Sequence, residues 1–169
     1  MELNRLEERL MRLLTENDLT VTTAESCTGG MVAAAIVDIP GVSEYFHAGF
    51  VTYSEKAKAE LLNVNPDTIK VYNVVSVETA QEMAAGAAKR VHADCAIATT
   101  GVAGPGGGTE EIPVGCVCFG CVVRGHVFSE KKIFQGSRKE IRNQAAEEAI
   151  RFLIAGIEEV TNYKQSREF

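Results

Sequence analysis

Three short segments of the sequence bring hydroxyl, basic and glycine residues together in patterns that could support catalysis. These segments are 24–30 (AESCTGG), 53–58 (YSEKAK) and 99–108 (TTGVAGPGGG). In the first, Ser26 lies between a β-branched run and an Ala-rich apolar run, which predicts a turn from a strand into a helix. The free N–H groups and the dipole at a helix start favour an anion, or an oxyanion made during acyl transfer. Ser26 is therefore a candidate nucleophile, although an equally ordinary interpretation is that Ser26 or Thr28 only caps the helix.

The second segment places a tyrosine and a lysine where a new helix should begin. With Ser54 as the N-cap, Tyr53 and Lys58 occupy the two positions that touch in a hydrophobic staple. Lys58 would then face the positive end of the helix dipole with Lys56 nearby, so its ammonium form is disfavoured and its free amine can act as a base. Such a base suits a Ser-Lys pair. The more ordinary interpretation of a lone helical lysine is a solvated surface residue.

The third segment is a loop rich in glycine after an apolar run. Its glycines are Gly101, Gly104, Gly106, Gly107 and Gly108. A glycine-rich backbone lets N–H groups approach a phosphate closely. The loop lacks the Gly-Lys-Ser/Thr end of a P-loop and the spacing of a dinucleotide-binding turn, so it indicates neither a kinase nor a dehydrogenase. A flexible turn around Pro105 is the ordinary alternative.

The cysteines offer one rival nucleophile and no metal site. Cys27 follows Ser26, and a helix start would lower the pKa of its thiol, but its side chain should point away from that of Ser26. Cys116 and Cys118 share one face of a predicted strand while Cys121 points to the other, so the three cannot form a tetrahedral zinc site. Because the histidines and carboxylates also lack metal-binding spacings, we expect no metal and no cofactor.

The elements that must position these segments alternate between helical and strand patterns. We expect helices at 2–16, from after residue 30 to 39, 54–62 and 76–91, strands at 20–24, 46–53 and 93–100, a hairpin of 114–123 with 126–134, and a last helix from a Ser137–Glu140 capping box towards Val160. Helices between strands, together with a hairpin, predict a layered α/β domain with a mixed sheet.

Composition limits the class of protein. The 169 residues suit one domain, which we place at 1–160 with a frayed tail at 161–169. A net charge of −6 argues against nucleic acid as a partner. No long apolar stretch or signal peptide is evident, so we expect no membrane association and a cytoplasmic protein, in which the five cysteines are free thiols.

Five segments in order resemble one known family. They are TAESCTGG, FVTYSEKAK, VSVETAQEMAAGA, ATTGVAGPGGGTEEIPVG and FQGSRKEIRNQAAEEAI. Over about residues 5–158 the chain resembles the CinA carboxy-terminal family, the stand-alone nicotinamide-nucleotide amidohydrolases. The resemblance implies a three-layer α/β domain that hydrolyses the carboxamide of nicotinamide mononucleotide, without a metal, to nicotinic acid mononucleotide and ammonia.

The same resemblance assigns roles to individual residues. Ser26 matches the nucleophile, Lys58 the base and Tyr53 a supporting hydroxyl. Thr100 matches the family's threonine before the glycine loop, and either Arg138 or Arg142 matches its arginine. The expected substrate-binding residues are Thr28, Gly29, Gly30, Thr100, Gly101, Gly104, Gly106, Gly107, Arg138 and Arg142, with N–H groups of the helix holding the oxyanion and the glycine loop and an arginine holding the 5′-phosphate.

Two other functions remain open from the sequence. One is a non-catalytic nucleotide-binding or regulatory module, and the other is an amidohydrolase for a different amide-bearing nucleotide. In each case the expected partner is a small-molecule nucleotide. A homo-oligomer is expected only on general grounds, because symmetric oligomers are common among soluble proteins.

Overall fold

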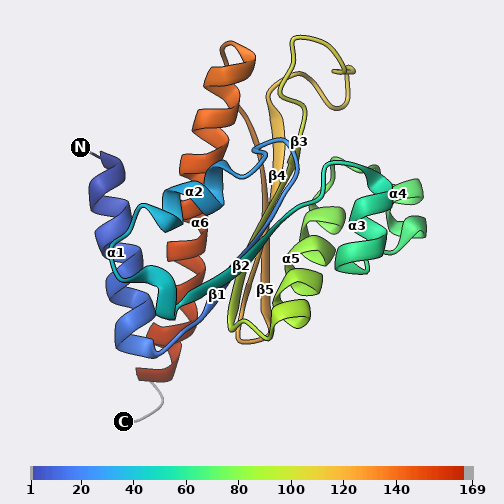
Figure 1. Ribbon diagram of the computed structural model, residues 1–169. Coiled ribbons are helices and arrows are strands. Elements are labelled where there is room, and N and C mark those ends of the chain that lie inside the picture. The colour runs from blue at the N-terminus through green and yellow to red at the C-terminus, as the bar shows by residue number, and fades with distance from the viewer. Residues whose placement is uncertain (1, 166–169) are drawn as a thin grey trace.

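The protein is a three-layer α/β domain, seen here in a computed structural model that describes residues 2–165 (Figure 1). The helices are α1 (Glu2–Asn17), α2 (Met31–Val37), α3 (Glu55–Leu62), α4 (Pro66–Tyr72), α5 (Val77–Val91) and α6 (Arg138–Gln165), with a short 3-10 turn at Val42–Glu44. The strands are β1 (Val21–Glu25), β2 (Phe46–Val51), β3 (Cys95–Gly101), β4 (Cys116–Val123) and β5 (His126–Ile133). The expected fold class is confirmed.

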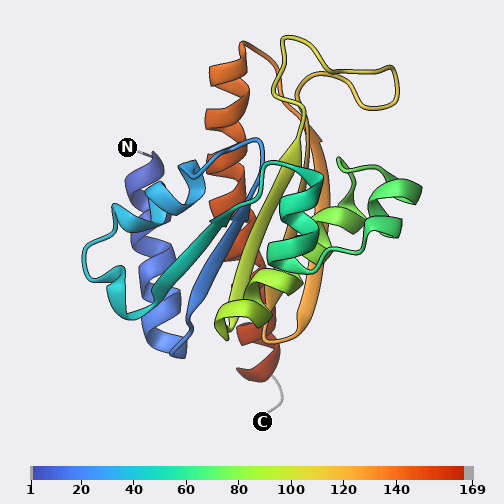
Figure 2. The same cartoon turned by 45° about the vertical axis from the view of Figure 1, so that its right-hand side comes forward.

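The five strands form one mixed sheet in the order β2-β1-β3-β4-β5. Strands β1, β2 and β3 are parallel, and the β4–β5 hairpin adds antiparallel strands beside β3. Helices α1, α2 and α6 cover one face of the sheet, and α3, α4 and α5 lie on the other (Figures 1 and 2). The predicted hairpin across Arg124 and Gly125 is confirmed, with both residues at positive φ.

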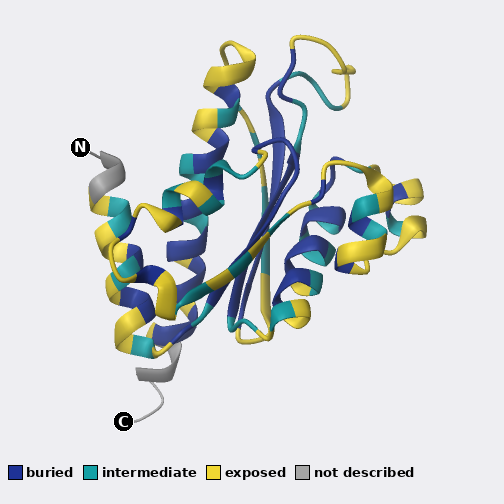
Figure 3. Cartoon of the chain, in the orientation of Figure 1, coloured by how far each residue is buried: buried dark blue, intermediate teal, exposed yellow. Residues whose placement is uncertain are grey.

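The central strands are buried on both faces, as their apolar runs require (Figure 3). Cys121 packs in the core beneath α6, whereas Cys116 and Cys118 pack with Ala80 of α5 on the opposite face. The alternation predicted for these cysteines is therefore confirmed. All five cysteines are free and buried.

The parallel strands bring the candidate residues to one edge of the sheet. Glu25 pairs with Val51 on one side and with Thr99 on the other, so Ser26, just past β1, and Thr100, near the end of β3, lie at neighbouring strand ends. This edge, outside the carboxyl ends of parallel strands, is where open α/β sheets bind their ligands. Helix α3 packs closely on α5 at Gly86. A Cβ added at this glycine would lie only 1.8 Å from the Leu62 carbonyl oxygen.

Two helices differ from the sequence expectations or extend them. Helix α4 was not expected, although Asn65 caps it and Pro66 occupies its first turn, because seven residues are too few to show a helical period. Helix α6 continues to Gln165, past the expected end of the domain at 160, and the buried Thr161 donates a hydrogen bond to the Ile157 carbonyl. The rest of the expected frayed tail, 166–169, lies outside the described residues. None of the described helices is both long and apolar enough to span a membrane.

Candidate active site

Ser26 and Lys58 form a buried hydrogen-bonded pair. The Lys58 ammonium nitrogen Nζ lies 2.9 Å from Ser26 Oγ and donates a second hydrogen bond to the Thr52 carbonyl at 2.7 Å. Lys58 is fully buried and Ser26 is 8% exposed. The interpretation of Lys58 as a solvated surface residue is therefore wrong, and the structure brings the two residues together as a Ser-Lys pair requires.

Helix α3 delivers Lys58 to this position from its first turn. Ser54 is the N-cap, and its side chain accepts a hydrogen bond from the Ala57 N–H at 3.0 Å. The predicted capping position is confirmed. It places Lys58 one turn into the helix, from where its side chain reaches back across the end of β2 to Ser26.

Burial lowers the pKa of Lys58 from about 10.5 to about 8. The expected direction is correct, but the cause differs from the sequence argument. Lys56 is exposed and pairs with Glu60 at 3.7 Å, so it does not act as the invoked neighbouring charge. Removal of the ammonium group from water is the main cause, and electrostatic interactions with Cys27 and Glu55 oppose it.

The turn that carries Ser26 is capped by a residue that the sequence analysis missed. The fully buried Glu25 accepts hydrogen bonds from the Val32 N–H at 2.8 Å and the Ala33 N–H at 3.1 Å, at the start of α2. The Thr28 hydroxyl donates to the same carboxylate at 2.6 Å. The N-cap itself, Gly30, has φ 101° and no side-chain cap. The alternative in which Ser26 or Thr28 caps the helix is therefore wrong.

Glu25 also changes which N–H groups could hold an oxyanion. The expectation assigned this role to the start of α2, but Glu25 already occupies the N–H groups of Val32 and Ala33. Within the described residues, the N–H groups of Cys27 and Thr28 form no hydrogen bond with a backbone carbonyl. The turn beside Ser26 therefore has N–H groups without a backbone acceptor, whereas two N–H groups at the start of α2 are occupied by Glu25. A charged residue in the otherwise uncharged run 21–28 was the available signal for Glu25.

The two candidate arginines have different positions. Arg142 donates to the carbonyls of Cys27 at 2.9 Å and Thr28 at 3.2 Å, so it braces the turn from α6. Arg138 donates to the Gly104 carbonyl at 2.8 Å and to the Tyr53 hydroxyl at 3.2 Å. Of the two, Arg138 lines the cavity described next. Arg138 is therefore the better candidate for a substrate contact.

A cavity of about 360 Å³ opens beside the Ser-Lys pair. It is lined by Ser26, Cys27, Tyr53, Lys58, Asn73, Val74, Val75, Thr100, Gly101, Val102, Ala103, Gly104, Gly106, Gly107, Thr109, Ile112 and Arg138. The lining includes Lys58 and Arg138 but no carboxylate, so it suits an anionic ligand. Its size falls within the usual range for small-molecule sites.

Most of the predicted substrate-binding residues line this cavity, and a few do not. Thr100 and Gly101, Gly104, Gly106 and Gly107 are part of the lining. Thr28, Gly29, Gly30 and Arg142 are not, because they form or brace the turn behind Ser26. The hydroxyl of Thr28 is shared between Glu25 and Thr99 and has no exposed surface, so a direct substrate contact by this side chain is contradicted.

Comparison with known proteins identifies the family. A family model described as the CinA C-terminal domain matches residues 3–157. The chain belongs to this family. A putative competence-damage inducible protein of Clostridium beijerinckii is 52% identical over 140 residues, which cover 83% of this chain and 34% of the relative. A CinA-like protein of Chloroherpeton thalassium is 47% identical over 88% of this chain and 37% of the relative. The chain thus spans about a third of the length of these curated relatives.

Solved structures of CinA-type proteins share the fold. The competence or damage-inducible protein from Enterobacter asburiae superposes with a TM-score of 0.88 at 34% identity, covering 92% of this chain and 98% of that one. The competence/damage inducible protein from Agrobacterium tumefaciens gives a TM-score of 0.87 at 41% identity, with coverages of 92% and 95%. The architecture of this CinA domain is therefore common to proteins from distant bacteria.

Cys27 is a poor rival to Ser26 as nucleophile in this CinA domain. Burial raises the pKa of its thiol to about 11, opposite to the lowering expected at a helix start. Cys27 also lines the cavity beside Ser26 and Lys58. A thiol with so high a pKa remains protonated at neutral pH, and the thiolate is the reactive form.

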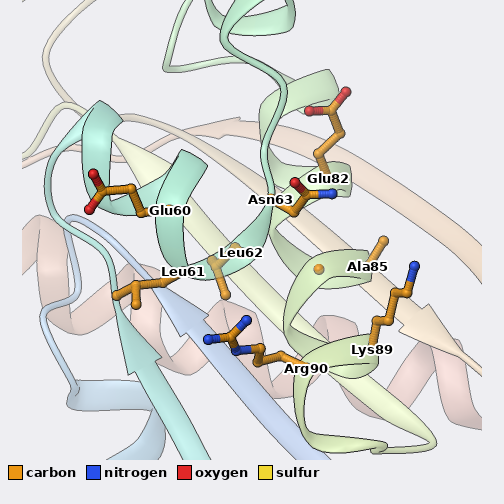
Figure 4. A pocket seen from close by; sticks show the side chains of 9 residues that line it. Glu60, Leu61, Leu62, Asn63, Glu82, Ala85, Lys89 and Arg90 are labelled. Atoms are coloured by element: carbon orange, nitrogen blue, oxygen red, sulfur yellow. The ribbon is translucent and has the colours of Figure 1, made fainter.

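A second cavity of the CinA domain lies between α3 and α5 and has a different character (Figure 4). It measures about 580 Å³ and is lined by Glu60, Leu61, Leu62, Asn63, Glu82, Ala85, Gly86, Lys89 and Arg90. It contains no hydroxyl, thiol or imidazole nucleophile. Glu82 already accepts hydrogen bonds from the Asn65 N–H and the Thr68 hydroxyl, so it holds α4 in place. Within residues 2–165, no three His, Cys, Asp or Glu side chains gather as metal ligands.

Proposed function

We propose that this CinA domain is a metal-independent amidohydrolase that converts nicotinamide mononucleotide to nicotinic acid mononucleotide and ammonia. The observation that carries the proposal is the 2.9 Å contact between Ser26 Oγ and Lys58 Nζ, buried beside a cavity without carboxylates. A serine and a lysine in hydrogen-bond contact are sufficient as nucleophile and base for amide hydrolysis. The anionic phosphate of the substrate matches the positive lining of the cavity.

Acylation begins with Lys58 as the base. The neutral amine of Lys58 takes the proton of the Ser26 hydroxyl while Oγ attacks the carboxamide carbon of the substrate. The resulting oxyanion is held by the N–H group of Cys27, a residue that lines the cavity beside Ser26 and whose N–H forms no hydrogen bond with a backbone carbonyl. The Lys58 ammonium then returns its proton to the leaving nitrogen, the C–N bond breaks and ammonia departs, which leaves an ester on Ser26.

Deacylation repeats these steps with water. Lys58, neutral again, takes a proton from a water molecule that attacks the ester carbon. The second oxyanion collapses, Oγ recovers the proton from Lys58, and the carboxylate product leaves. The Thr52 carbonyl accepts a 2.7 Å hydrogen bond from Lys58 Nζ. This bond keeps Nζ directed at Ser26 during both acylation and deacylation.

Binding energy for the phosphate comes from the opposite end of the cavity. Arg138 projects from the start of α6 to the glycine loop, where it meets the Gly104 carbonyl and the Tyr53 hydroxyl. A guanidinium and exposed loop N–H groups are suitable donors for phosphate oxygens. Contacts remote from the reacting carbon can position the carboxamide at Ser26.

The test is ammonia release over a panel of amides with and without ribose phosphate, using purified protein. Nicotinamide mononucleotide should give the highest kcat/KM, and free nicotinamide should be much poorer because it lacks the phosphate. Mass spectrometry of quenched reactions should detect the acylated Ser26 peptide. Preference for another amide-bearing nucleotide would replace the substrate in this proposal, and nucleotide binding without ammonia release would identify a regulatory module instead.

A further inference from the structure

Asn73 ends α4 with an unusual backbone conformation at the edge of the cavity. Its φ of 83° and ψ of 156° fall in a region that is essentially restricted to glycine. A residue with a side chain persists there only when its surroundings fix it, and such residues gather at ligand sites. The conformation therefore calls for an explanation in terms of what the side chain does.

The surroundings do fix this residue on three sides. The Asn73 carbonyl accepts hydrogen bonds from the hydroxyls of Ser76 and Thr79, each at 2.8 Å, at the start of α5. The Asn73 N–H donates to the Ile69 carbonyl at 2.9 Å. The next carbonyl, that of Val74, accepts the Thr100 hydroxyl at 2.9 Å, which ties the loop to the end of β3.

The side chain is held with its oxygen turned inward. Oδ1 of Asn73 accepts the Val75 N–H at 3.1 Å, and only the oxygen end of the carboxamide can accept a hydrogen bond. Nδ2 keeps two N–H donors, and among the described residues it has no hydrogen-bond partner. Asn73 is exposed and lines the same cavity as Ser26 and Lys58. The cavity therefore has a fixed, uncharged donor that the mechanism above does not use.

We propose that Asn73 is a specificity-determining residue that donates a hydrogen bond from Nδ2 to an uncharged oxygen of the substrate. This inference rests on the proposed function. The acceptor is a ribose hydroxyl, because Arg138 and the glycine loop supply the donors for the phosphate, and the carboxamide oxygen, which becomes the oxyanion, is held beside Ser26. Asn73 follows α4 and Arg138 begins α6, and these helices lie on opposite faces of the sheet (Figure 1).

Two variants with different side effects test the inference through the KM and kcat of ammonia release. Asn73→Gly permits the backbone conformation but removes the bond to the Val75 N–H. Asn73→Asp keeps that acceptor but adds a negative charge. The loss common to both variants is that of the N–H donor. We expect KM to rise about tenfold or more in both, the size of one lost hydrogen bond, with kcat within about twofold of the parent value.

Asn63 provides a matched control. It is also an asparagine at positive φ, 56°, that ends a helix, but it lines the groove between α3 and α5 (Figure 4). Asn63→Gly and Asn63→Asp should leave KM unchanged. An unchanged KM in Asn73→Gly would overturn the inference, as would an equal rise of KM in the Asn63 variants.

Substrate analogues identify the oxygen that Asn73 contacts. If the acceptor is a ribose hydroxyl, 2′-deoxy or 3′-deoxy nicotinamide mononucleotide should abolish the difference in KM between Asn73→Gly and the parent protein. A difference that persists with both analogues would contradict the assignment of a ribose hydroxyl as the acceptor. Retention of deamidation by Ser26→Ala would contradict the proposed function, whereas an unchanged KM in Asn73→Gly would contradict this inference alone.

Discussion

The two sides of the cavity are built in opposite ways. The Ser26 turn is buried. It is held by the preceding residue, Glu25, which accepts hydrogen bonds from the start of α2, and by Arg142 from α6. The glycine loop projects past the end of the sheet, and residues 105–110 are exposed (Figure 2). An added Cβ at Gly106 would meet no atom within 4 Å. Under the proposed function, the reacting atoms would be fixed in advance, while the proposed phosphate-binding side could adjust to its ligand.

This division has a physical reason. Attack on an amide needs the nucleophile, the base and the oxyanion donors in place before charge develops, since reorganisation would add to the barrier. A loop that binds a phosphate through its N–H groups gains from conformational freedom, because it can close after the ligand enters. Substitutions in the turn should therefore change kcat, and substitutions in the loop should change KM.

The largest effect is expected for Ser26→Ala. Loss of the nucleophile should lower kcat by at least about a thousandfold while nucleotide binding and the melting temperature change little. Steady-state ammonia release and calorimetric binding measure these quantities. Cys27→Ala is the neighbouring control and should keep most of the activity. If Cys27→Ala lost turnover and Ser26→Ala kept it, the nucleophile would be assigned to the wrong residue.

Lys58→Arg should be almost as damaging as Lys58→Ala, because a guanidinium keeps the charge but cannot act as a base. In the parent protein the active form of Lys58 is the neutral amine, so kcat should rise with pH through about 8 and then level off. Between pH 8 and 10.5 the unfolded chain holds a proton on this lysine that the folded chain has lost. The contribution of Lys58 to the free energy of unfolding should therefore increase with pH across that window. A kcat independent of pH between 6 and 9 would contradict the role of Lys58 as the base.

Glu25→Gln tests whether the turn must be held rigidly. One oxygen of the carboxylate would become an N–H₂ group facing the N–H donors of Val32 or Ala33, which leaves a buried donor unpaired at a cost of about 1–3 kcal/mol in the free energy of unfolding. We also expect kcat to fall about tenfold or more with KM little changed, because Ser26 follows directly in the chain. Glu44→Gln, at an exposed glutamate of the 3-10 turn Val42–Glu44, is the control. A destabilised variant with the parent kcat would show that Glu25 serves only the fold.

The smallest effects belong to the loop. Gly106→Ala adds a methyl group in open space and should leave kcat and the melting temperature unchanged, with at most about a twofold change in KM. Gly107 has φ 83°, so Gly107→Ala should strain the loop and raise KM further without lowering kcat. A fall in kcat for either variant would show that the loop takes part in the chemical step and would remove the distinction between the two sides.

The sequence predicted the layers and the candidates Ser26 and Lys58, which the structure brings into contact, because these depend on local patterns. The cap at Ser54 and the position of Lys58 follow from spacing within one helix. The support of the turn could not be predicted in the same way, because Arg142 reaches Cys27 and Thr28 across more than a hundred residues of chain. The predicted lowering of the Cys27 pKa was wrong for a similar reason. Burial of the thiol in the folded chain outweighs the local effect of a helix start.

The close contact at Gly86 limits how this protein can diverge. Helix α3 holds Lys58 in its first turn and lies against α5 through the Leu62 carbonyl, which occupies the space that any side chain at Gly86 would need. A mutation there would push α3 outward and carry the base away from Ser26, although Gly86 contacts neither residue of the pair. Selection for turnover can thus act on a position that has no side chain and no chemistry of its own. Lineages that lose the need for catalysis should be free to accept larger residues at this crossing, and their sequences would record that loss.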